Sequence, residues 1–164
     1  MIDTTICLPM LGKPPNQVLL ALKKRGFGMG KITGVGGKIE AWETAAHSAV
    51  RELAEEIGIT VALADLQARG VIDFLFPFKP SWNMRSYLFV VDAWQGSPSE
   101  SDEVAPQFYL FDQIPFERMW ADARHWLPPL LQNQSIRARF VFGEDNETIT
   151  EWNVEQEPFL FYSK

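Results

Sequence analysis

The sequence predicts an α/β (α+β) sandwich built around a mixed sheet, and three observations indicate this fold. Strand-like segments flank one central amphipathic helix, a second helical segment comes late in the chain, and too few helices separate the strands for a doubly wound parallel sheet. At 164 residues the chain is long enough to bury a substantial core, and we expect residues 1–164 to form a single domain.

The first half of the chain contains two expected strands and the central helix. Thr4 to Leu11 and Gln17 to Lys23 are apolar runs separated by a turn that contains Gly, Pro and Asn. After a glycine-rich stretch, a helix is expected from about Thr44 to Ile57 because apolar residues recur there every three or four positions. Gly58 is typical of a residue that ends a helix. The apolar positions are Ala46, Val50, Leu53 and Ile57.

The second half contains further strands and one further helix. Two hairpins are expected from pairs of apolar runs joined by polar turns, and a single strand is expected after a polar loop that ends near Glu103. A helix is expected from Ala121 to Gln132, although Pro128 and Pro129 disfavour its middle. The hairpin strands are Val71–Phe78 with Met84–Asp92 and Ile136–Phe142 with Thr148–Val154, and the single strand lies near Gln107–Phe111.

The composition is ordinary for a soluble globular protein, with 46% apolar and 22% charged residues. No run of about eighteen apolar residues is present, so we expect no contact with a membrane. The first residues lack the basic and apolar regions of a signal peptide. The single cysteine, Cys7, excludes an intramolecular disulfide and is expected to be a buried filler, which fits a cytoplasmic location.

The charge pattern argues against long nucleic acid as a partner and favours a loop that contacts phosphate groups. A net charge of −6 argues against binding long nucleic acid through its backbone. Five basic residues nevertheless cluster within a glycine-rich stretch just before the central helix, a pattern that favours a phosphate-contacting loop over a merely solvated one. These residues are Lys23, Lys24, Arg25, Lys31 and Lys38.

One motif dominates the sequence, in the segment from Gly37 to Ile59. It reads G-x5-E-x7-R-E-Φ-x-E-E-x-G-Φ, where Φ is apolar. Seven fixed residues at background frequencies would coincide in roughly 10⁻⁸ of windows, which excludes chance.

Three glutamates of this motif, Glu52, Glu55 and Glu56, are spaced at i, i+3 and i+4 and therefore share a helix face. Like charges on one face repel each other, whereas Mg²⁺ or Mn²⁺ would turn the cluster into a binding site. Such glutamates are usually only a solvated face. The adjacent Arg51 and the bracketing glycines favour the metal site here.

The motif resembles the Nudix box of hydrolases that act on nucleoside diphosphates linked to another moiety. Four further segments are similar to the MutT-homologue branch, the oxidised-purine nucleoside triphosphatases of the 8-oxo-dGTP diphosphatase type, and the similarity extends from about Gln17 to Trp152. The resemblance implies a Nudix-type α/β/α sandwich with a mixed sheet. The four segments are Lys23–Lys31, Gln95–Glu103, Asp112–Phe116 and Met119–Trp120.

The resemblance also implies roles for particular residues. Arg51 is expected to pair with a box glutamate, and Glu55 or Glu56 to orient or deprotonate the attacking water. The expected catalytic residues are Arg51, Glu52, Glu55 and Glu56. The divalent ion, Mg²⁺ or alternatively Mn²⁺, would be held by Glu52, Glu55, Glu56, Glu103 and the carbonyl of Gly36. Substrate contacts are implied for Lys23, Val35, Gly36, Gly37 and Lys38, for the base-pocket residues Phe27, Phe74, Met84, Trp120 and Trp126, and for Asp122 at the base edge.

Two positions depart from the family pattern, because Thr33 replaces a carboxamide and Ala123 replaces a second aspartate. Catalysis is expected to survive these changes, and base preference is left open. The sequence thus predicts hydrolysis of a nucleoside triphosphate, such as 8-oxo-dGTP, to the monophosphate and pyrophosphate. The alternatives are a Nudix pyrophosphatase for a normal or pyrimidine triphosphate or ADP-ribose, and a non-catalytic nucleotide sensor. The expected partner is a small nucleotide, with the protein a monomer or weak dimer.

Overall fold

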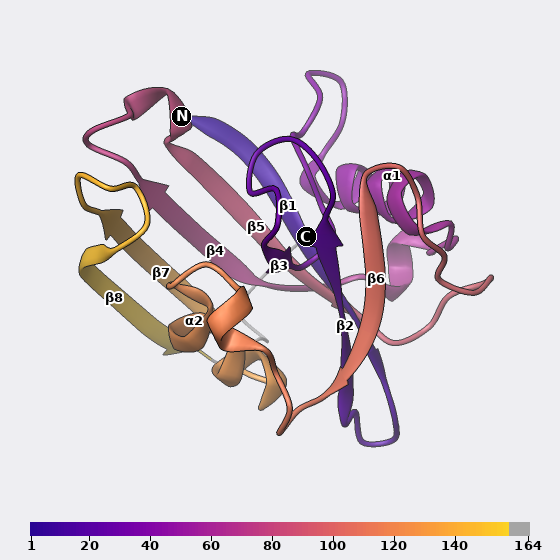
Figure 1. The fold of residues 1–164 in the computed structure, drawn as a ribbon. Coiled ribbons are helices and arrows are strands. Elements are labelled where there is room, and N and C mark those ends of the chain that lie inside the picture. Colours follow the sequence, from indigo (N-terminus) through magenta and orange to yellow (C-terminus); the bar gives the residue numbers. More distant parts are fainter. Residues whose placement is uncertain (158–164) are drawn as a thin grey trace.

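The computed structural model describes residues 1–157, which form one eight-stranded mixed sheet and two α-helices (Figure 1). The strands follow the order β3-β2-β1-β5-β4-β7-β8, and β6 pairs with β2 on a separate branch. The strands are β1 (Ile2–Leu11), β2 (Gln17–Lys23), β3 (Ile32–Thr33), β4 (Gln67–Leu75), β5 (Met84–Val91), β6 (Val104–Leu110), β7 (Ser135–Phe142) and β8 (Ile149–Glu157). The helices are α1 (Ala45–Ile57), α2 (Ala123–Leu131) and the 3₁₀ turns η1 (Leu63–Asp65), η2 (Pro80–Trp82) and η3 (Phe116–Arg118).

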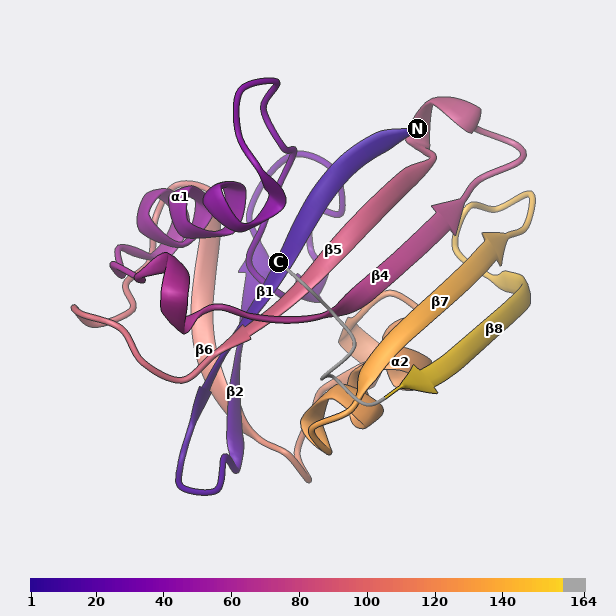
Figure 2. The ribbon, with the colours of Figure 1, turned by 180° about the vertical axis from the view of Figure 1, so that it is seen from behind.

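Strand β1 joins two wings of the sheet. It pairs antiparallel with β2 only at its end, through Met10 and Leu11, and parallel with β5 over the eight residues from Ile2 to Pro9. The wing of β2, β3 and β6 lies near α1, whereas β4, β7 and β8 form the other side (Figures 1 and 2). The expected α+β sandwich with a mixed sheet is therefore confirmed.

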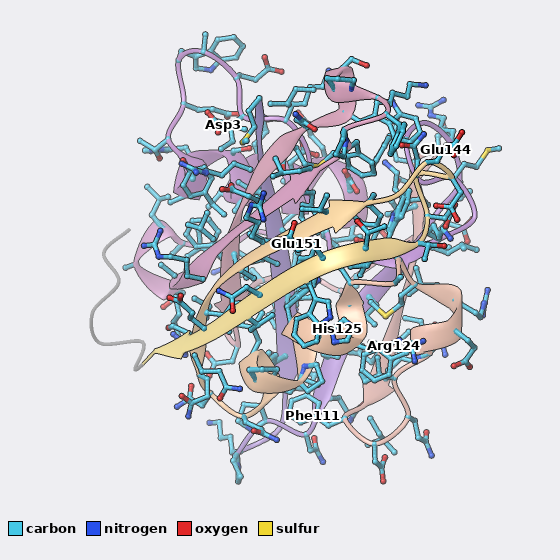
Figure 3. All side chains as sticks on the ribbon, turned by 90° about the vertical axis from the view of Figure 1, so that its left-hand side faces the viewer. Asp3, Phe111, Arg124, His125, Glu144 and Glu151 are labelled. Atoms are coloured by element: carbon cyan, nitrogen blue, oxygen red, sulfur yellow. The ribbon has the colours of Figure 1, made fainter. Side chains whose placement is uncertain are left out.

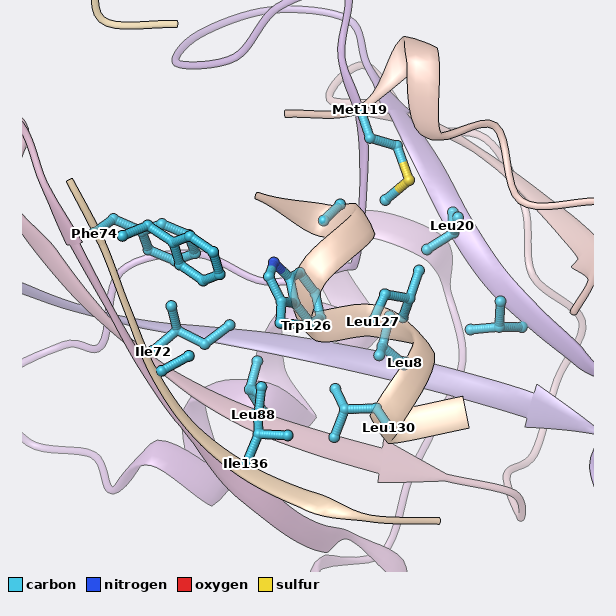
Figure 4. Close-up of a cluster of buried hydrophobic side chains, with 14 of the residues drawn as sticks. Leu8, Leu20, Ile72, Phe74, Leu88, Met119, Trp126, Leu127, Leu130 and Ile136 are labelled. Atoms are coloured by element: carbon cyan, nitrogen blue, oxygen red, sulfur yellow. The ribbon is translucent and has the colours of Figure 1, made fainter. Parts of the chain in front are cut away.

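The two faces of β1 build two separate cores, because successive side chains of a strand point in opposite directions. Leu8 and Met10 join the core under α2, together with Trp126 and Leu127 (Figure 4). Cys7 joins the core under α1 and is fully buried, as expected for a filler, and burial raises the pKa of its thiol to about 12.

Helix α1 begins and ends where the sequence predicts. The Thr44 hydroxyl accepts a hydrogen bond of 3.1 Å from the His47 N–H, which satisfies a donor at the open end of the helix. Gly58 ends the helix in the left-handed region with a φ of 74°, a conformation that favours glycine.

Helix α2 forms despite its two prolines. Pro128 and Pro129 lie inside its nine residues, and the main chain turns out of the helix soon after them, where the Gln132 N–H reaches both proline carbonyls. The helix is held against β7 and β8, where His125 stacks on Trp152 with 4.1 Å between the ring centroids (Figure 3).

Several of the expected boundaries were wrong. Strand β4 begins four residues earlier than predicted, because the polar residues Gln67 and Arg69 and a bulge next to Gly70 hide its alternating pattern. It also ends before Phe76, whose N–H turns to the side chain of Asn83. Strand β6 begins at Val104 rather than near Gln107, and the two-residue β3 was not predicted. Within residues 1–157, no helix is long and apolar enough to cross a membrane.

Candidate active site

The glutamates of α1 are organised by Arg51. Its guanidinium donates hydrogen bonds of 2.6 and 3.0 Å to the two carboxylate oxygens of Glu43, and further ones to Glu52 at 3.0 Å and Glu55 at 3.2 Å. It also reaches the carbonyl of Lys38 at 3.1 Å. Arg51 therefore ties the helix to the glycine loop, in agreement with the expectation that it positions a box glutamate.

Glu43 is the strongest partner of Arg51. Its side chain is only 6% exposed, and the hydrogen bonds from Arg51 hold its pKa at about 2. The second hydrogen-bond partner of Glu43 is the N–H of Glu40, at 2.8 Å. The carboxylate thus remains ionised and braces the loop that precedes α1.

Glu52 and Glu56 form a buried acidic pair one turn apart on α1. Both residues are less than 10% exposed. Burial raises the pKa of Glu56 well above its usual range, and the hydrogen bond and negative charge of Glu52 raise it further, whereas Lys23 lowers it. A buried carboxylate pair is costly unless a cation or proton compensates it. The donor chemistry therefore fits a hard divalent ion.

The glycine loop lies directly against this pair. A Cβ added to Gly37 would lie 2.6 Å from a carboxylate oxygen of Glu52, and one added to Gly36 would lie 1.8 Å from the Thr5 carbonyl. The loop is held to β1 by hydrogen bonds from the Thr5 N–H to Gly37 and from the Ile39 N–H to Asp3. Only glycine permits this close approach of main chain to carboxylate.

The remaining glutamates of the expected metal site, Glu103 and Glu55, each form an ion pair with an arginine. Glu103 accepts hydrogen bonds of 2.6 and 3.0 Å from Arg25, which lower the pKa of its carboxyl, and Glu55 is largely exposed beside Arg51. Within the described part of the chain, no three acidic, histidine or cysteine side chains are gathered as a ready metal cage. Glu103 would therefore have to exchange Arg25 for the ion, whereas Arg51 holds Oε2 of Glu55, so Glu55 would bind the ion through Oε1 without releasing Arg51.

A cavity of about 700 Å³ connects the acidic helix to an aromatic chamber. All but two of the expected site residues line the cavity. The exceptions are Val35 and Arg51, and Arg51 contacts the cavity residues Glu52 and Glu55 without lining the cavity itself. The cavity residues predicted from the sequence are Lys23, Phe27, Thr33, Gly36, Gly37, Lys38, Glu52, Glu55, Glu56, Phe74, Met84, Glu103, Trp120, Asp122 and Trp126.

Val35 does not line the cavity, although the sequence predicts that its main chain contacts the substrate. Its side chain is fully buried in the core under α1, and its N–H and carbonyl both pair with Cys7, at 3.1 and 2.6 Å. The main-chain groups that the sequence assigned to substrate are thus already used by a β-bridge at this residue. The loop residues that follow Val35, namely Gly36, Gly37 and Lys38, line the cavity.

The aromatic chamber is formed by rings from four segments. Phe27 stacks on Trp120 with centroids 5.4 Å apart and meets Trp82 edge-on at 4.9 Å. Phe76 and Phe142 stack at 4.5 Å. Trp82, Phe76 and Phe142 were not assigned to the pocket from the sequence, because an aromatic residue of a strand or turn gives no sign of whether it lines a core or a cavity.

Asp122 is the acidic group of this chamber. It lies just before α2, is 4% exposed, and accepts a hydrogen bond of 2.6 Å from the Trp126 indole N–H. Burial raises its pKa to about 6, opposed by Trp126 and by the charge of Lys31. Lys31 itself lies over the Trp120 ring at 5.0 Å and pairs with Glu147 at 2.9 Å. The adjacent Ala123 supplies no second acid.

The site combines a helix that carries glutamates, a glycine loop and an aromatic chamber. This combination is typical of a hydrolase that acts on nucleotides. The chain belongs to the NUDIX domain family, whose domain matches residues 3–130. Nudix hydrolases act on small nucleotides and use divalent metal ions. The chain is 41% identical over 142 residues to the oxidized purine nucleoside triphosphate hydrolase of Mus musculus, covering 87% of this chain and 88% of the mouse protein. The protein of the same description from Danio rerio is 42% identical over 142 residues, with the same coverage.

Solved structures support the fold. The MutT protein of Bacillus halodurans superposes with a TM-score of 0.78 at 22% identity, over 94% of this chain and 98% of that chain. A bifunctional NMN adenylyltransferase/ADP ribose pyrophosphatase of Francisella tularensis, complexed with AMP and a manganese ion, gives a TM-score of 0.61 at 21% identity, over 80% of this chain and 41% of that chain. At these identities the likeness concerns the fold alone.

Proposed function

We infer that this protein hydrolyses oxidised purine nucleoside triphosphates, such as 8-oxo-dGTP, to the monophosphate and pyrophosphate. The observation that carries the inference is one continuous cavity with the acidic helix at one end and a ring-lined chamber containing a buried carboxyl at the other. The mouse and zebrafish relatives are named oxidized purine nucleoside triphosphate hydrolases, which supports the substrate class.

The acidic end is proposed to hold Mg²⁺, with Mn²⁺ as a substitute. Glu52 and Glu56 would be its buried ligands, joined by Glu55, Glu103 and the Gly36 carbonyl. A divalent ion bound there supplies charge neutralisation for a polyphosphate and lowers the pKa of water. Arg51 keeps Glu52 and Glu55 in place, because its guanidinium bonds both.

The chain's own groups would bind and orient the triphosphate. Lys23 and Lys38 line the cavity close to the glutamates and would pair with phosphate oxygens. The main chain of Gly36 and Gly37 allows the phosphates to approach closely. Glu55 or Glu56 would accept a proton from the attacking water.

The chamber is proposed to stack and read the base. Phe27 and Trp120 offer flat faces, and stacking on such rings is worth about 1–3 kcal/mol per base. One carboxylate oxygen of Asp122 is taken by Trp126, which leaves the other to accept from base N–H groups. Guanine presents two adjacent N–H donors on its Watson–Crick edge, so a guanine-type edge suits an ionised Asp122.

The test is pyrophosphate release with Mg²⁺ across oxidised and normal purine triphosphates, a pyrimidine triphosphate and ADP-ribose. We expect 8-oxo-dGTP to be preferred over dGTP. Equal rates for the two would overturn the proposed substrate class and leave a broader Nudix pyrophosphatase.

A second measurement separates an enzyme from a nucleotide sensor. Glu56→Gln should fold and still bind nucleotide but lose turnover by orders of magnitude, whereas Glu151→Gln, an exposed change on β8, should retain it. Unchanged turnover in Glu56→Gln would contradict the assignment of the acidic helix to catalysis.

A further inference from the structure

Two hydroxyl groups lie side by side on the floor of the chamber. Ser86 in the middle of β5 is 1% exposed, and its Oγ lies 2.6 Å from the Oγ1 of Thr4 on β1. The two residues are register partners on adjacent strands, and both line the cavity. We refer to them below as the hydroxyl pair.

The fold itself gives no reason for hydroxyls at this point. On the same face of the sheet, the neighbours along β5 and β1 are Met84, Leu88 and Ile6, all apolar. Leu88 belongs to the core under α2, and Met84 and Ile6 pack against that core. The mutual hydrogen bond only offsets the free-energy cost of burying two hydroxyls, and β-branched apolar residues would pack here without that cost. The pair thus points to a role in the cavity.

The pair has hydrogen-bonding capacity left over after its mutual bond. Each hydroxyl has one donor and two acceptor sites, and their contact uses one donor and one acceptor. Thr4 also lies 3.4 Å from the carbonyl of Arg85, a weak alternative acceptor for its proton. Because hydroxyl protons rotate, the pair can offer the cavity an acceptor and a donor together.

The pair and Asp122 belong to different walls of the chamber. The hydroxyls stand on the strands β1 and β5, whereas Asp122 precedes α2, which covers the sheet from the side of β7 and β8. Phe74 and Met84 extend the floor next to the pair. If a purine presents its Watson–Crick edge to Asp122, its five-membered ring points away from Asp122 and toward another wall of the chamber.

We propose that the hydroxyl pair of Thr4 and Ser86 determines specificity by reading the oxidised edge of the purine, accepting from its N7–H and donating to its 8-oxo oxygen. The proposal rests on the proposed function, since it concerns the same chamber. An unoxidised purine has a bare N7 acceptor and a C8–H at these positions, so it leaves part of the pair unsatisfied. Unsatisfied buried polar groups discriminate strongly between related ligands.

The test compares kcat/KM for 8-oxo-dGTP and dGTP in Ser86→Ala, Thr4→Val and the double variant. We expect the ratio of the two kcat/KM values to fall roughly five- to tenfold in each single variant, the size of one lost hydrogen bond. The double variant should lose little more than either single variant, because the two hydroxyls act as a unit. Ser135→Ala is the matched control, a fully buried strand serine outside this cavity, and should leave the ratio unchanged.

A binding measurement removes catalysis and metal from the test. Calorimetry with 8-oxo-dGMP and dGMP in the absence of metal should show the same loss of preference in both single variants, with melting temperatures confirming that they are folded. An unchanged ratio in folded variants, when the wild type prefers 8-oxo-dGTP, would overturn the role of the pair. A wild type without that preference would instead overturn the proposed function.

Discussion

The indole N–H of Trp126 donates a hydrogen bond of 2.6 Å to Oδ2 of Asp122, inside a chamber that is otherwise lined mainly by aromatic rings. The contact fixes the carboxyl group and leaves one oxygen for a ligand. The positive charge of Lys31 favours the ionised form of this carboxyl. Asp122 therefore has two usable protonation states close to neutral pH.

The protonation state of Asp122 predicts a pH-dependent choice of base. With a pKa of about 6, Asp122 is a carboxylate above that pH and accepts from a guanine-type edge, whereas below it the neutral acid donates to the N1 acceptor of adenine. We expect kcat/KM for 8-oxo-dGTP to rise through about pH 6 relative to that for an adenine triphosphate. Steady-state kinetics from pH 5 to 8 check this, and Asp122→Asn should give a ratio that no longer changes near pH 6.

The same burial predicts a stability effect. The pKa of Asp122 is raised from 3.8 in the unfolded chain to about 6 in the fold, so between these values the native state holds more protons than the unfolded state. The contribution of Asp122 to stability is therefore highest below pH 3.8 and declines as the pH rises to about 6. Urea unfolding of the wild type and Asp122→Asn should show that the substitution becomes less destabilising, or stabilising, across this window. A difference that does not change with pH would contradict it.

The contacts of Arg51 predict that Arg51→Lys loses activity although the positive charge is kept. Arg51→Lys keeps one positive charge but cannot bond Glu43 through two nitrogens while also reaching Glu52 and Glu55. Groups that hold metal ligands typically cost 10–100-fold in activity or metal affinity when changed, and we expect a loss of roughly that size. The readouts are kcat and the Mg²⁺ concentration dependence, with Arg139→Lys, an exposed arginine on β7, as the control.

Much of this architecture could be predicted from the sequence, because local patterns determine it. The helix limits at Thr44 and Gly58 follow from capping chemistry, and the glutamate spacing places Glu52 and Glu56 on one face in any regular helix. Cys7 and the aromatic strands follow from apolar runs. These features need no knowledge of which strand lies beside which.

What the sequence could not supply depends on contacts between distant segments. The hydroxyls of Thr4 and Ser86 meet only because β1 runs parallel to β5, 82 residues apart in sequence. The Arg25–Glu103 pair and the bridge that occupies Val35 likewise join segments with no local signal. Whether a polar residue binds a ligand, holds another residue in place or has neither role therefore depends on tertiary contacts.

The Arg25–Glu103 ion pair predicts competition with metal. Arg25 donates to the carboxylate that the metal site is expected to use, so removing it should free Glu103. Because both side chains are well exposed, the pair is weak, and we expect Mn²⁺ to bind roughly two- to fivefold more tightly in Arg25→Ala. Calorimetric titration with Mn²⁺ measures this, with Arg118→Ala, an exposed arginine of η3, as the comparison. Weaker binding in Arg25→Ala would show that Arg25 supports the ion rather than competes with it.

The close contact between Gly37 and Glu52 predicts that a side chain at position 37 impairs the metal site. A methyl group at this position would lie 2.6 Å from Oε1 of Glu52, so Gly37→Ala should push the carboxylate aside without disturbing the cores. We expect a folded protein whose apparent affinity for Mg²⁺ and whose kcat both fall by at least about tenfold, because a displaced ligand weakens the whole site. Gly143→Ala is the control, since its added methyl meets a threonine methyl on β8 at 3.0 Å, far from the acidic helix in the fold. Wild-type kinetics in Gly37→Ala would mean that Glu52 can move away from the loop without cost, and it would then no longer be a fixed ligand.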